Sequence, residues 1–242
     1  MGRSGRRIHT FKQFVVHDDA CGMKVGTDAL LLGSWAGEAK ALAQETMTDV
    51  LDIGTGSGIL ALMLAQRFPA AHVHAVELEP DAACQAKENA ARSPFCDRIS
   101  VHHRAIQGWG GSVDLAVCNP PFFHGRPKSP DRKRNLARHD DALPLPSLFS
   151  SVKACLRSDG EFAMVFPEDR ASELEAVAEV SGFHLWAKVT LQATHAHDVI
   201  RSLWSWRLES CQHPRREAWH LEGPAGQGMW SDSIAARLAS FI

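Results

Sequence analysis

Val50-Leu51-Asp52-Ile53-Gly54-Thr55-Gly56-Ser57-Gly58 is the stretch that indicates the fold of this 242-residue chain. Its apolar first half predicts a short buried strand, which runs directly into a turn with glycine at every second position. Residues 59–68 are apolar and predict a helix. Glycines let the backbone approach a ligand closely, and the start of a helix exposes N–H groups. The unit therefore predicts a ligand site at its turn.

The spacing of these glycines argues against a dinucleotide ligand. The dinucleotide fingerprint is Gly-x-Gly-x-x-Gly, and Ile59 occupies the place of its last glycine. Residues 72–77 predict a second strand that ends in Glu77, nineteen residues after Gly58. This spacing suits a carboxylate that accepts hydrogen bonds from both hydroxyls of a ribose. The turn and the carboxylate together predict a nucleoside ligand without a pyrophosphate.

The rest of the chain continues the alternation of strands and helices. We expect further strands at residues 99–102, 113–118, 161–166, 183–189 and 202–208, and helices at residues 81–92, 148–156, 171–181 and 231–241. These patterns predict one α/β domain over residues 1–242, with about seven mostly parallel strands and helices on both faces. Because no long helix separates the last two strands, we expect the last strand to return antiparallel.

Asn119-Pro120-Pro121-Phe122 follows the strand at residues 113–118. The two prolines force the backbone to turn there, and open α/β sheets bind ligands at the carboxyl ends of their strands. The Asn119 side-chain oxygen and the Pro120 carbonyl can both accept hydrogen bonds, so together they could hold an NH2 group. Phe122 could stack on a flat ring. The alternative is an ordinary strand exit with a buried phenylalanine.

A basic segment follows this motif at residues 124–139, where Asp131 is the only acid. Pro127 and Pro130 disfavour regular structure in it. A basic loop beside a ligand site suggests a polyanion, most simply a nucleic acid. We assign this role to its six cations: Arg126, Lys128, Arg132, Lys133, Arg134 and Arg138. A solvated charged loop is the alternative.

The N-terminal region carries three weaker signals. Residues 1–10 predict a mobile basic arm, and residues 11–16 predict a strand with aromatic side chains on one face. A short helix is expected over residues 29–35. Thr27 or Asp28 could cap it, and its start could also receive a carboxylate.

The composition is that of an ordinary globular protein, with 45% hydrophobic residues, 22% charged residues and a net charge of −2. No apolar run is long enough to span a membrane, and six scattered cysteines form no Cys-x-x-Cys, so we expect free thiols and a cytoplasmic location. Thirteen histidines raise the question of a metal. The pairs His102-His103 and His195-x-His197 lack the partners of a zinc site, and we expect no metal.

Residues 51–58 resemble the cofactor loop of S-adenosylmethionine-dependent methyltransferases, and residues 119–122 resemble the signature of those that methylate an amide or exocyclic amine. More narrowly, the chain looks like the bacterial tRNA1(Val) adenine-N6 methyltransferase family. The matching stretches are residues 11–14, 23–28, 32–35, 60–66, 75–78 and 93–94. The resemblance is thin after about Asp169.

The resemblance implies a class I methyltransferase fold, the cofactor S-adenosyl-L-methionine, and methylation of adenine N6 at position 37 in the anticodon loop of a tRNA. It implies that residues 11–36 form a cap over cofactor and substrate. It assigns the target base to Asn119, Pro120 and Phe122. The cofactor contacts it implies are Lys24, Thr27, Asp28, Asp52, Gly54, Gly56, Gly58, Glu77 and Asn119. Ala105 departs from the family, because related enzymes usually carry an acid there that contacts the cofactor adenine.

Two other functions stay open. A protein glutamine N5-methyltransferase holds its amide with the same signature, although the basic segment argues against it. A non-catalytic factor that binds cofactor and RNA would be expected to have lost the 119–122 motif, which is intact here.

Overall fold

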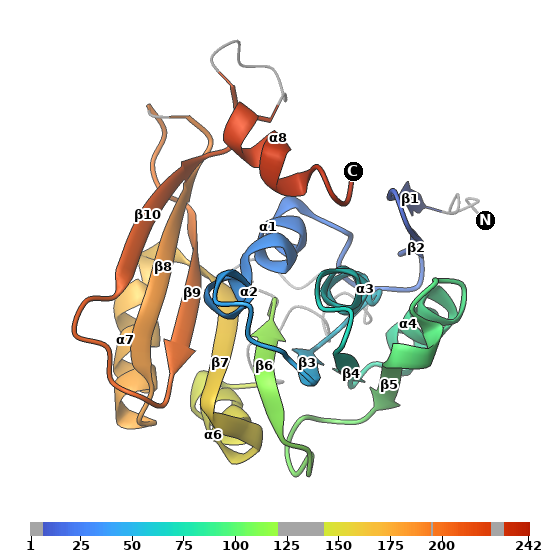
Figure 1. Cartoon of the computed structure of the whole chain (residues 1–242), viewed down its shortest axis with the longest axis horizontal. Coiled ribbons are helices and arrows are strands. Elements are labelled where there is room, and N and C mark those ends of the chain that lie inside the picture. Colours follow the sequence, from blue (N-terminus) through green and yellow to red (C-terminus); the bar gives the residue numbers. More distant parts are fainter. Residues whose placement is uncertain (1–6, 121–142, 195, 224–229) are drawn as a thin grey trace, which may run out of the picture.

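The computed structural model describes residues 7–120, 143–194, 196–223 and 230–242. Within these residues the chain builds an eight-stranded sheet of order β10-β8-β9-β7-β6-β3-β4-β5, with a separate β1-β2 hairpin (Figure 1). The strands of the large sheet are β3 (Asp49–Ile53), β4 (His72–Glu77), β5 (Ile99–His103), β6 (Val113–Cys118), β7 (Leu156–Pro167), β8 (His184–Gln192), β9 (Arg201–Arg207) and β10 (Arg215–His220).

Seven of these strands confirm the predicted sheet. Strands β3 to β7 pair in parallel, and β9 runs antiparallel to both β7 and β8. The eighth strand, β10, was not predicted, and it pairs in parallel with the outer edge of β8. Its sequence is Arg-Arg-Glu-Ala-Trp-His, and of these side chains only that of Trp219 is buried. An edge strand of this kind has no apolar run to reveal it.

Helices cover both faces of the sheet, as predicted (Figure 1). Side chains on successive residues of β3 enter opposite cores. Val50 belongs to the core that includes α1 (Thr27–Trp35), α3 (Ile59–Arg67) and α8 (Asp232–Leu238), and Leu51 belongs to the core that includes α6 (Leu145–Cys155) and α7 (Ala171–Val180). Helix α4 adds Ala90 to the first of these cores. The helices are α1 (Thr27–Trp35), α2 (Glu38–Leu42), α3 (Ile59–Arg67), α4 (Pro80–Ala91), α6 (Leu145–Cys155), α7 (Ala171–Val180) and α8 (Asp232–Leu238), with single 3-10 turns at Cys96–Arg98 and Glu168–Arg170. Within the described residues, no helix is long and apolar enough to cross a membrane.

The prediction of one strand over residues 11–16 is wrong. Strands β1 (Ile8–Thr10) and β2 (Val15–His17) form an antiparallel hairpin, and residues 11–14 are its turn. The Phe11 N–H donates to the Phe14 carbonyl at 2.9 Å, and the two buried rings stack 4.7 Å apart. The spacing of Phe11 and Phe14 in the sequence therefore reflects a hairpin turn that directs both rings into the core. Residues 8–10, assigned to the basic arm, belong to β1, while residues 1–6 of that arm lie outside the described part of the chain.

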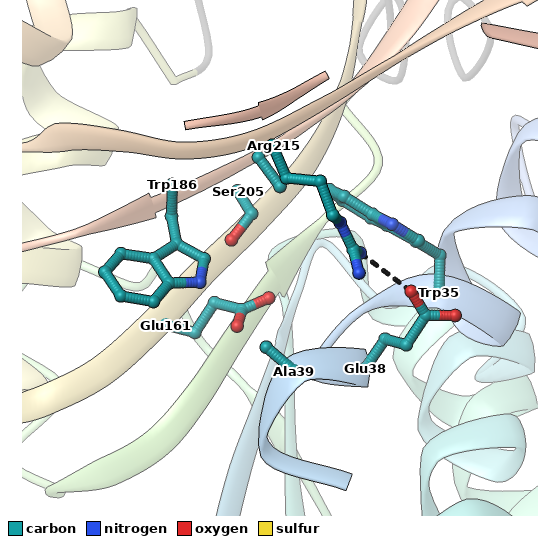
Figure 2. Close-up of a pocket in the computed structure, with 8 residues that line it drawn as sticks. Trp35, Glu38, Ala39, Glu161, Trp186, Ser205 and Arg215 are labelled. Carbon is teal, nitrogen blue, oxygen red and sulfur yellow. Dashed lines mark hydrogen bonds and ion pairs between the residues drawn. The ribbon is translucent and has the colours of Figure 1, made fainter. Parts of the chain in front are cut away.

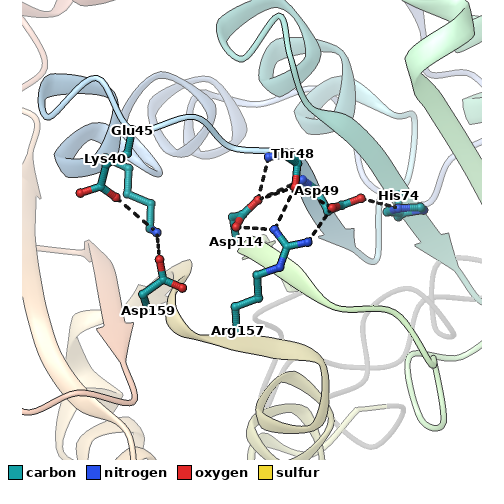
Figure 3. A network of polar contacts seen from close by, with 8 residues as sticks. All are labelled: Lys40, Glu45, Thr48, Asp49, His74, Asp114, Arg157 and Asp159. Atoms are coloured by element: carbon teal, nitrogen blue, oxygen red, sulfur yellow. Dashed lines mark hydrogen bonds and ion pairs between the residues drawn. The ribbon is translucent and has the colours of Figure 1, made fainter.

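A polar network ties β3, β6 and β7 together at the end of the sheet where β3 and β6 begin (Figure 3). The buried Asp114 carboxylate accepts the backbone N–H groups of Thr48 (2.7 Å) and Asp49 (3.0 Å) and pairs with Arg157. Arg157 also pairs with the Asp49 carboxylate at 2.8 Å. Burial alone would raise the pKa of Asp114, but the hydrogen bonds from Arg157, Asp49 and Thr48 lower it below its usual value.

Candidate active site

A cavity of about 280 Å³ opens where β3, β4 and β6 end. Open α/β sheets place their ligands at this edge. We call it the glycine-turn cavity. Its wall is formed by the turn after β3, the segment after β4, the segment after β5, the end of β6 and part of the N-terminal region: Gly54, Gly56, residues 77–80, residues 104–107, residues 118–120 and residues 21–23. The cavity thus unites the two motifs that sequence analysis singled out.

The glycine-rich turn is held in a conformation that suits glycine. Gly54, Gly56 and Gly58 all have positive φ, at 69°, 55° and 84°. A Cβ at Gly54 or Gly56 would meet no described atom within 4 Å, so the backbone conformation, and not crowding, requires glycine there. Gly58 does not line the cavity; it begins α3, and its backbone faces Ala86 of α4.

Asp52 supports this turn from behind. Its side chain is fully buried and accepts the Thr55 hydroxyl and the Ala61 N–H, the latter at 3.1 Å. Its Oδ1 has no hydrogen-bond partner among the described residues. Burial raises the pKa of Asp52 to about 7, and the hydrogen bonds from Thr55 and Ala61 offset only part of that shift. Asp52 is not among the described residues that line the cavity, so its visible role is to shape the turn.

Glu77 lies in the cavity wall with its carboxylate fixed by three backbone N–H groups. One oxygen accepts from Gly56 at 2.9 Å, and the other accepts from Leu78 at 2.8 Å and Glu79 at 2.9 Å. The acid at the end of β4 is thus linked directly to the glycine-rich turn. Beyond it, the exposed Leu78 and the segment after β5 add apolar surface to the wall. Ala105, the position at which the resemblance implies an acid, lies in that segment.

Asn119 and Pro120 line the same cavity from the end of β6. The neighbouring Cys118 also lines it, but burial, followed by the charges of Asp52 and Glu77, raises the pKa of this thiol far above its ordinary value. Cys118 is therefore protonated and is no nucleophile. Phe122 and the six predicted RNA-binding cations lie outside the described residues.

Two polar residues of α4 hold the N-terminal segment against the cavity, and neither was predicted from the sequence. Gln85 accepts the Ala20 N–H at 3.0 Å, and Asn89 both accepts the His17 N–H and donates to the His17 carbonyl. Asn89 also donates to the Ser57 carbonyl of the glycine-rich turn at 2.8 Å. The two side chains are buried and lie four residues apart, on the side of α4 that faces the N-terminal segment. Two amides on the buried face of a helix are the signal that could have revealed them.

Lys24, Thr27 and Asp28 are not among the described residues that line the cavity. The prediction that Thr27 or Asp28 caps α1 is wrong, because Gly26 is the N-cap residue and no side chain caps the helix. Asp28 instead pairs with Arg201 of β9 at 2.7 Å. Burial raises the pKa of Asp28, and the Arg201 charge opposes that shift. Among the described residues, no group of three or more His, Cys, Asp or Glu side chains is placed to hold a metal.

Comparison with known proteins agrees with this geometry. Residues 38–183 match the family model of the methyltransferase small domain. A tRNA1(Val) (adenine(37)-N6)-methyltransferase of Porphyromonas gingivalis is 44% identical over 180 residues, which cover 71% of this chain and 69% of the relative. The enzyme of that name from Pedobacter heparinus is 35% identical over 236 residues and covers 96% of both chains. The chain belongs to the tRNA1(Val) (adenine(37)-N6)-methyltransferase family.

Solved structures of methyltransferases share the fold of this tRNA1(Val) (adenine(37)-N6)-methyltransferase family member. A predicted O-methyltransferase from Agrobacterium tumefaciens superposes with a TM-score of 0.65 at 18% identity, covering 88% of this chain and 96% of its own. A ribosomal protein L11 methylase from Lactobacillus delbrueckii has a TM-score of 0.52 at 19% identity and covers 74% and 76%. The fold is that of a class I methyltransferase.

Proposed function

We propose that this protein transfers the methyl group of S-adenosyl-L-methionine to N6 of an adenine in tRNA, at position 37 of the anticodon loop of tRNA1(Val). The observation that carries the proposal is the glycine-turn cavity, which joins Gly54, Gly56 and Glu77 to Asn119 and Pro120 in one space. The relatives named above carry the same activity in their names.

The cavity residues divide between cofactor and substrate. Gly54 and Gly56 would lie along the methionine part of the cofactor, and Glu77 would accept hydrogen bonds from its ribose hydroxyls. The apolar surface of Leu78 and Ile106 suits the adenine ring. When bound, S-adenosyl-L-methionine supplies an electrophilic methyl group on a sulfonium. Lys24, Thr27, Asp28, Asp52 and Gly58 remain proposed cofactor residues that act from outside this wall.

Asn119 and Pro120 perform the catalytic work by positioning the amine. The lone pair of an adenine amine is delocalised into the ring, which makes the nitrogen a poor nucleophile. If the Asn119 oxygen and the Pro120 carbonyl each accept one amine proton, the nitrogen becomes more tetrahedral and its lone pair is directed at the methyl group. The protonated Cys118 beside them offers no competing nucleophile.

The RNA would be held by the segment after the motif. Phe122 would stack on the target base, and the cations from Arg126 to Arg138 would contact phosphates. A base in an anticodon loop is already unpaired, so its entry into the cavity costs less than extrusion from a duplex.

Incubation of the purified protein with unmodified tRNA and methyl-labelled cofactor tests the proposal, with mass spectrometry of the digested nucleosides as readout. We expect N6-methyladenosine from position 37. Asn119→Ala should abolish turnover and leave cofactor affinity nearly unchanged, because it removes an acceptor of the amine while the contacts of Gly54, Gly56 and Glu77 with the cofactor remain. Label found in protein glutamine, and not in RNA, would replace the proposal by the glutamine N5-methyltransferase.

A further inference from the structure

A second cavity, of about 130 Å³, lies between the α1–α2 region and strands β7 to β10 (Figure 2). It shares none of its described lining residues with the glycine-turn cavity. Its wall includes Trp35 at the end of α1, Ala39 of α2, Glu161 of β7, Trp186 of β8, Ser205 of β9 and Arg215 of β10. We call it the tryptophan cavity.

Two indole rings give this cavity flat apolar walls. Trp35 is buried and Trp186 is half-buried, and they come from elements on different sides of the space. The Arg207 guanidinium lies 3.8 Å from the centre of the Trp186 ring and so stiffens that wall. Walls of this kind favour a planar ring that can stack.

Two buried polar side chains face the same space. Glu161 is only 3% exposed; one carboxylate oxygen accepts the Gly37 N–H at 3.1 Å, and the other lies 3.5 Å from Arg207, at the limit of a hydrogen bond. Ser205 is 1% exposed, and its hydroxyl has no hydrogen-bond partner among the described residues. Figure 2 shows this hydroxyl directed toward the space between Trp186 and Glu161. A buried hydroxyl without a hydrogen-bond partner is unfavourable, so a ligand that forms a hydrogen bond with Ser205 would be stabilised here.

The charges select among ligands. Each of the two carboxylates in the wall is paired with an arginine, Glu38 with Arg215 at 2.7 Å and Glu161 with Arg207 at 3.5 Å, so the site favours a neutral ligand over an ion. A purely apolar molecule would leave the Ser205 hydroxyl without a partner. The size is that of one aromatic ring, since a cavity of about 150 Å³ in another protein holds benzene. A planar ring with both an N–H edge and an acceptor meets all three conditions.

We propose that the tryptophan cavity binds an unpaired nucleobase of the RNA substrate; this identity rests on the proposed function. The base stacks against the indoles, its amino group donates to Glu161, and a ring nitrogen or carbonyl accepts from Ser205. The enzyme thereby holds its RNA at a second point, away from the methylated base.

The direct test is an NMR titration of the indole N–H signals with CMP, GMP, AMP and UMP. S-adenosylhomocysteine is added first, so that it fills the glycine-turn cavity and keeps nucleotides out of it. We expect the signals of Trp35 and Trp186 to shift with CMP, and to respond far less to GMP and AMP, whose bases have two rings, and to UMP, whose base has no amino group. The seven indole signals are assigned by single Trp→Phe variants.

Two variants that fill the cavity test whether the nucleotide binds inside it. Ala39→Leu places a larger side chain at the cavity from α2, and Ser205→Val does so from β9. Each should weaken nucleotide binding and tRNA binding about tenfold or more, because base–aromatic stacking contributes on that order. Ala41→Leu is the matched control, since Ala41 is exposed on the same short helix and does not line the cavity.

The outcomes separate this proposal from the proposed function. Unshifted Trp35 and Trp186 signals, or equal shifts in Ala39→Leu and the parent protein, overturn the base site and leave a cavity that holds water only. Equal shifts with UMP would overturn the assigned contact with Glu161. Absence of methyl transfer to tRNA by the unaltered protein overturns the proposed function, whatever the titration shows.

Discussion

Ala105 lies in the wall of the glycine-turn cavity beside Ile106 and Gln107, and its side chain offers no hydrogen-bond acceptor. If the cofactor adenine packs against this segment, its amino group has no carboxylate to bind there. Ala105→Asp should therefore tighten binding of S-adenosylhomocysteine by about tenfold, because a hydrogen bond to a charged group contributes about 1.5–3 kcal/mol. Isothermal titration calorimetry measures the change.

S-inosylhomocysteine, which lacks that amino group, is the control ligand for this substitution. Its affinity should not improve in Ala105→Asp. Equal gains for both ligands, or a loss for both, would show that residue 105 does not face the adenine amine.

At the scale of elements, α4 fastens the N-terminal segment to the glycine-rich turn. Asn89 bonds the backbone of His17 and of Ser57, and residues 21–23 of the fastened segment line the cavity. Asn89→Ala should weaken cofactor binding about tenfold and speed hydrogen exchange at residues 17–23, because buried backbone groups lose their partner. Glu88→Ala, on the exposed side of the same helix, should change neither. Unaltered exchange in Asn89→Ala would mean that Gln85 alone holds the segment.

Elements that are specified by neighbouring residues in the sequence could be predicted. Elements that depend on contacts between distant parts of the chain could not. Apolar runs, glycines and prolines act on the adjacent backbone. They identify the strand–turn–helix at residues 50–68 and the motif at Asn119. The amides of α4 are marked only by their place on the buried face of the helix, and their partners, 32 to 72 residues away, could not be predicted from the local sequence. Strand β10 is largely polar, and it forms by pairing with the edge of β8. The tryptophan cavity is lined by residues of six elements, and none of them carries a local sequence pattern that indicates it.

The molecule as a whole is held at both ends of its sheet by carboxylates whose pKa values are shifted in opposite directions. Asp114, whose pKa is lowered by Arg157 and by backbone N–H groups despite its burial, stabilises the fold above its unfolded pKa. That contribution is lost as the pH falls through the lower, folded value. Asp52, whose pKa is raised by burial to about 7, stabilises the fold most below its unfolded pKa and loses that contribution as the pH rises toward 7. The contribution of Asp52 to the stability of the fold, at the end of the sheet that carries the glycine-turn cavity, is therefore lost near neutral pH.

This difference predicts the pH dependence of stability in one variant. In Asp52→Asn the side chain keeps an acceptor for Thr55 and Ala61 and carries no charge at any pH. Between about pH 4 and pH 7, the unfolding free energy of the parent protein should fall relative to that of Asp52→Asn, with a slope approaching ~1.4 kcal/mol per pH unit. Urea unfolding of both proteins across this range measures the slope. Because every other titrating group is common to the two proteins, their difference isolates Asp52. A flat difference would show that the Asp52 carboxylate ionises at its ordinary pH despite its burial.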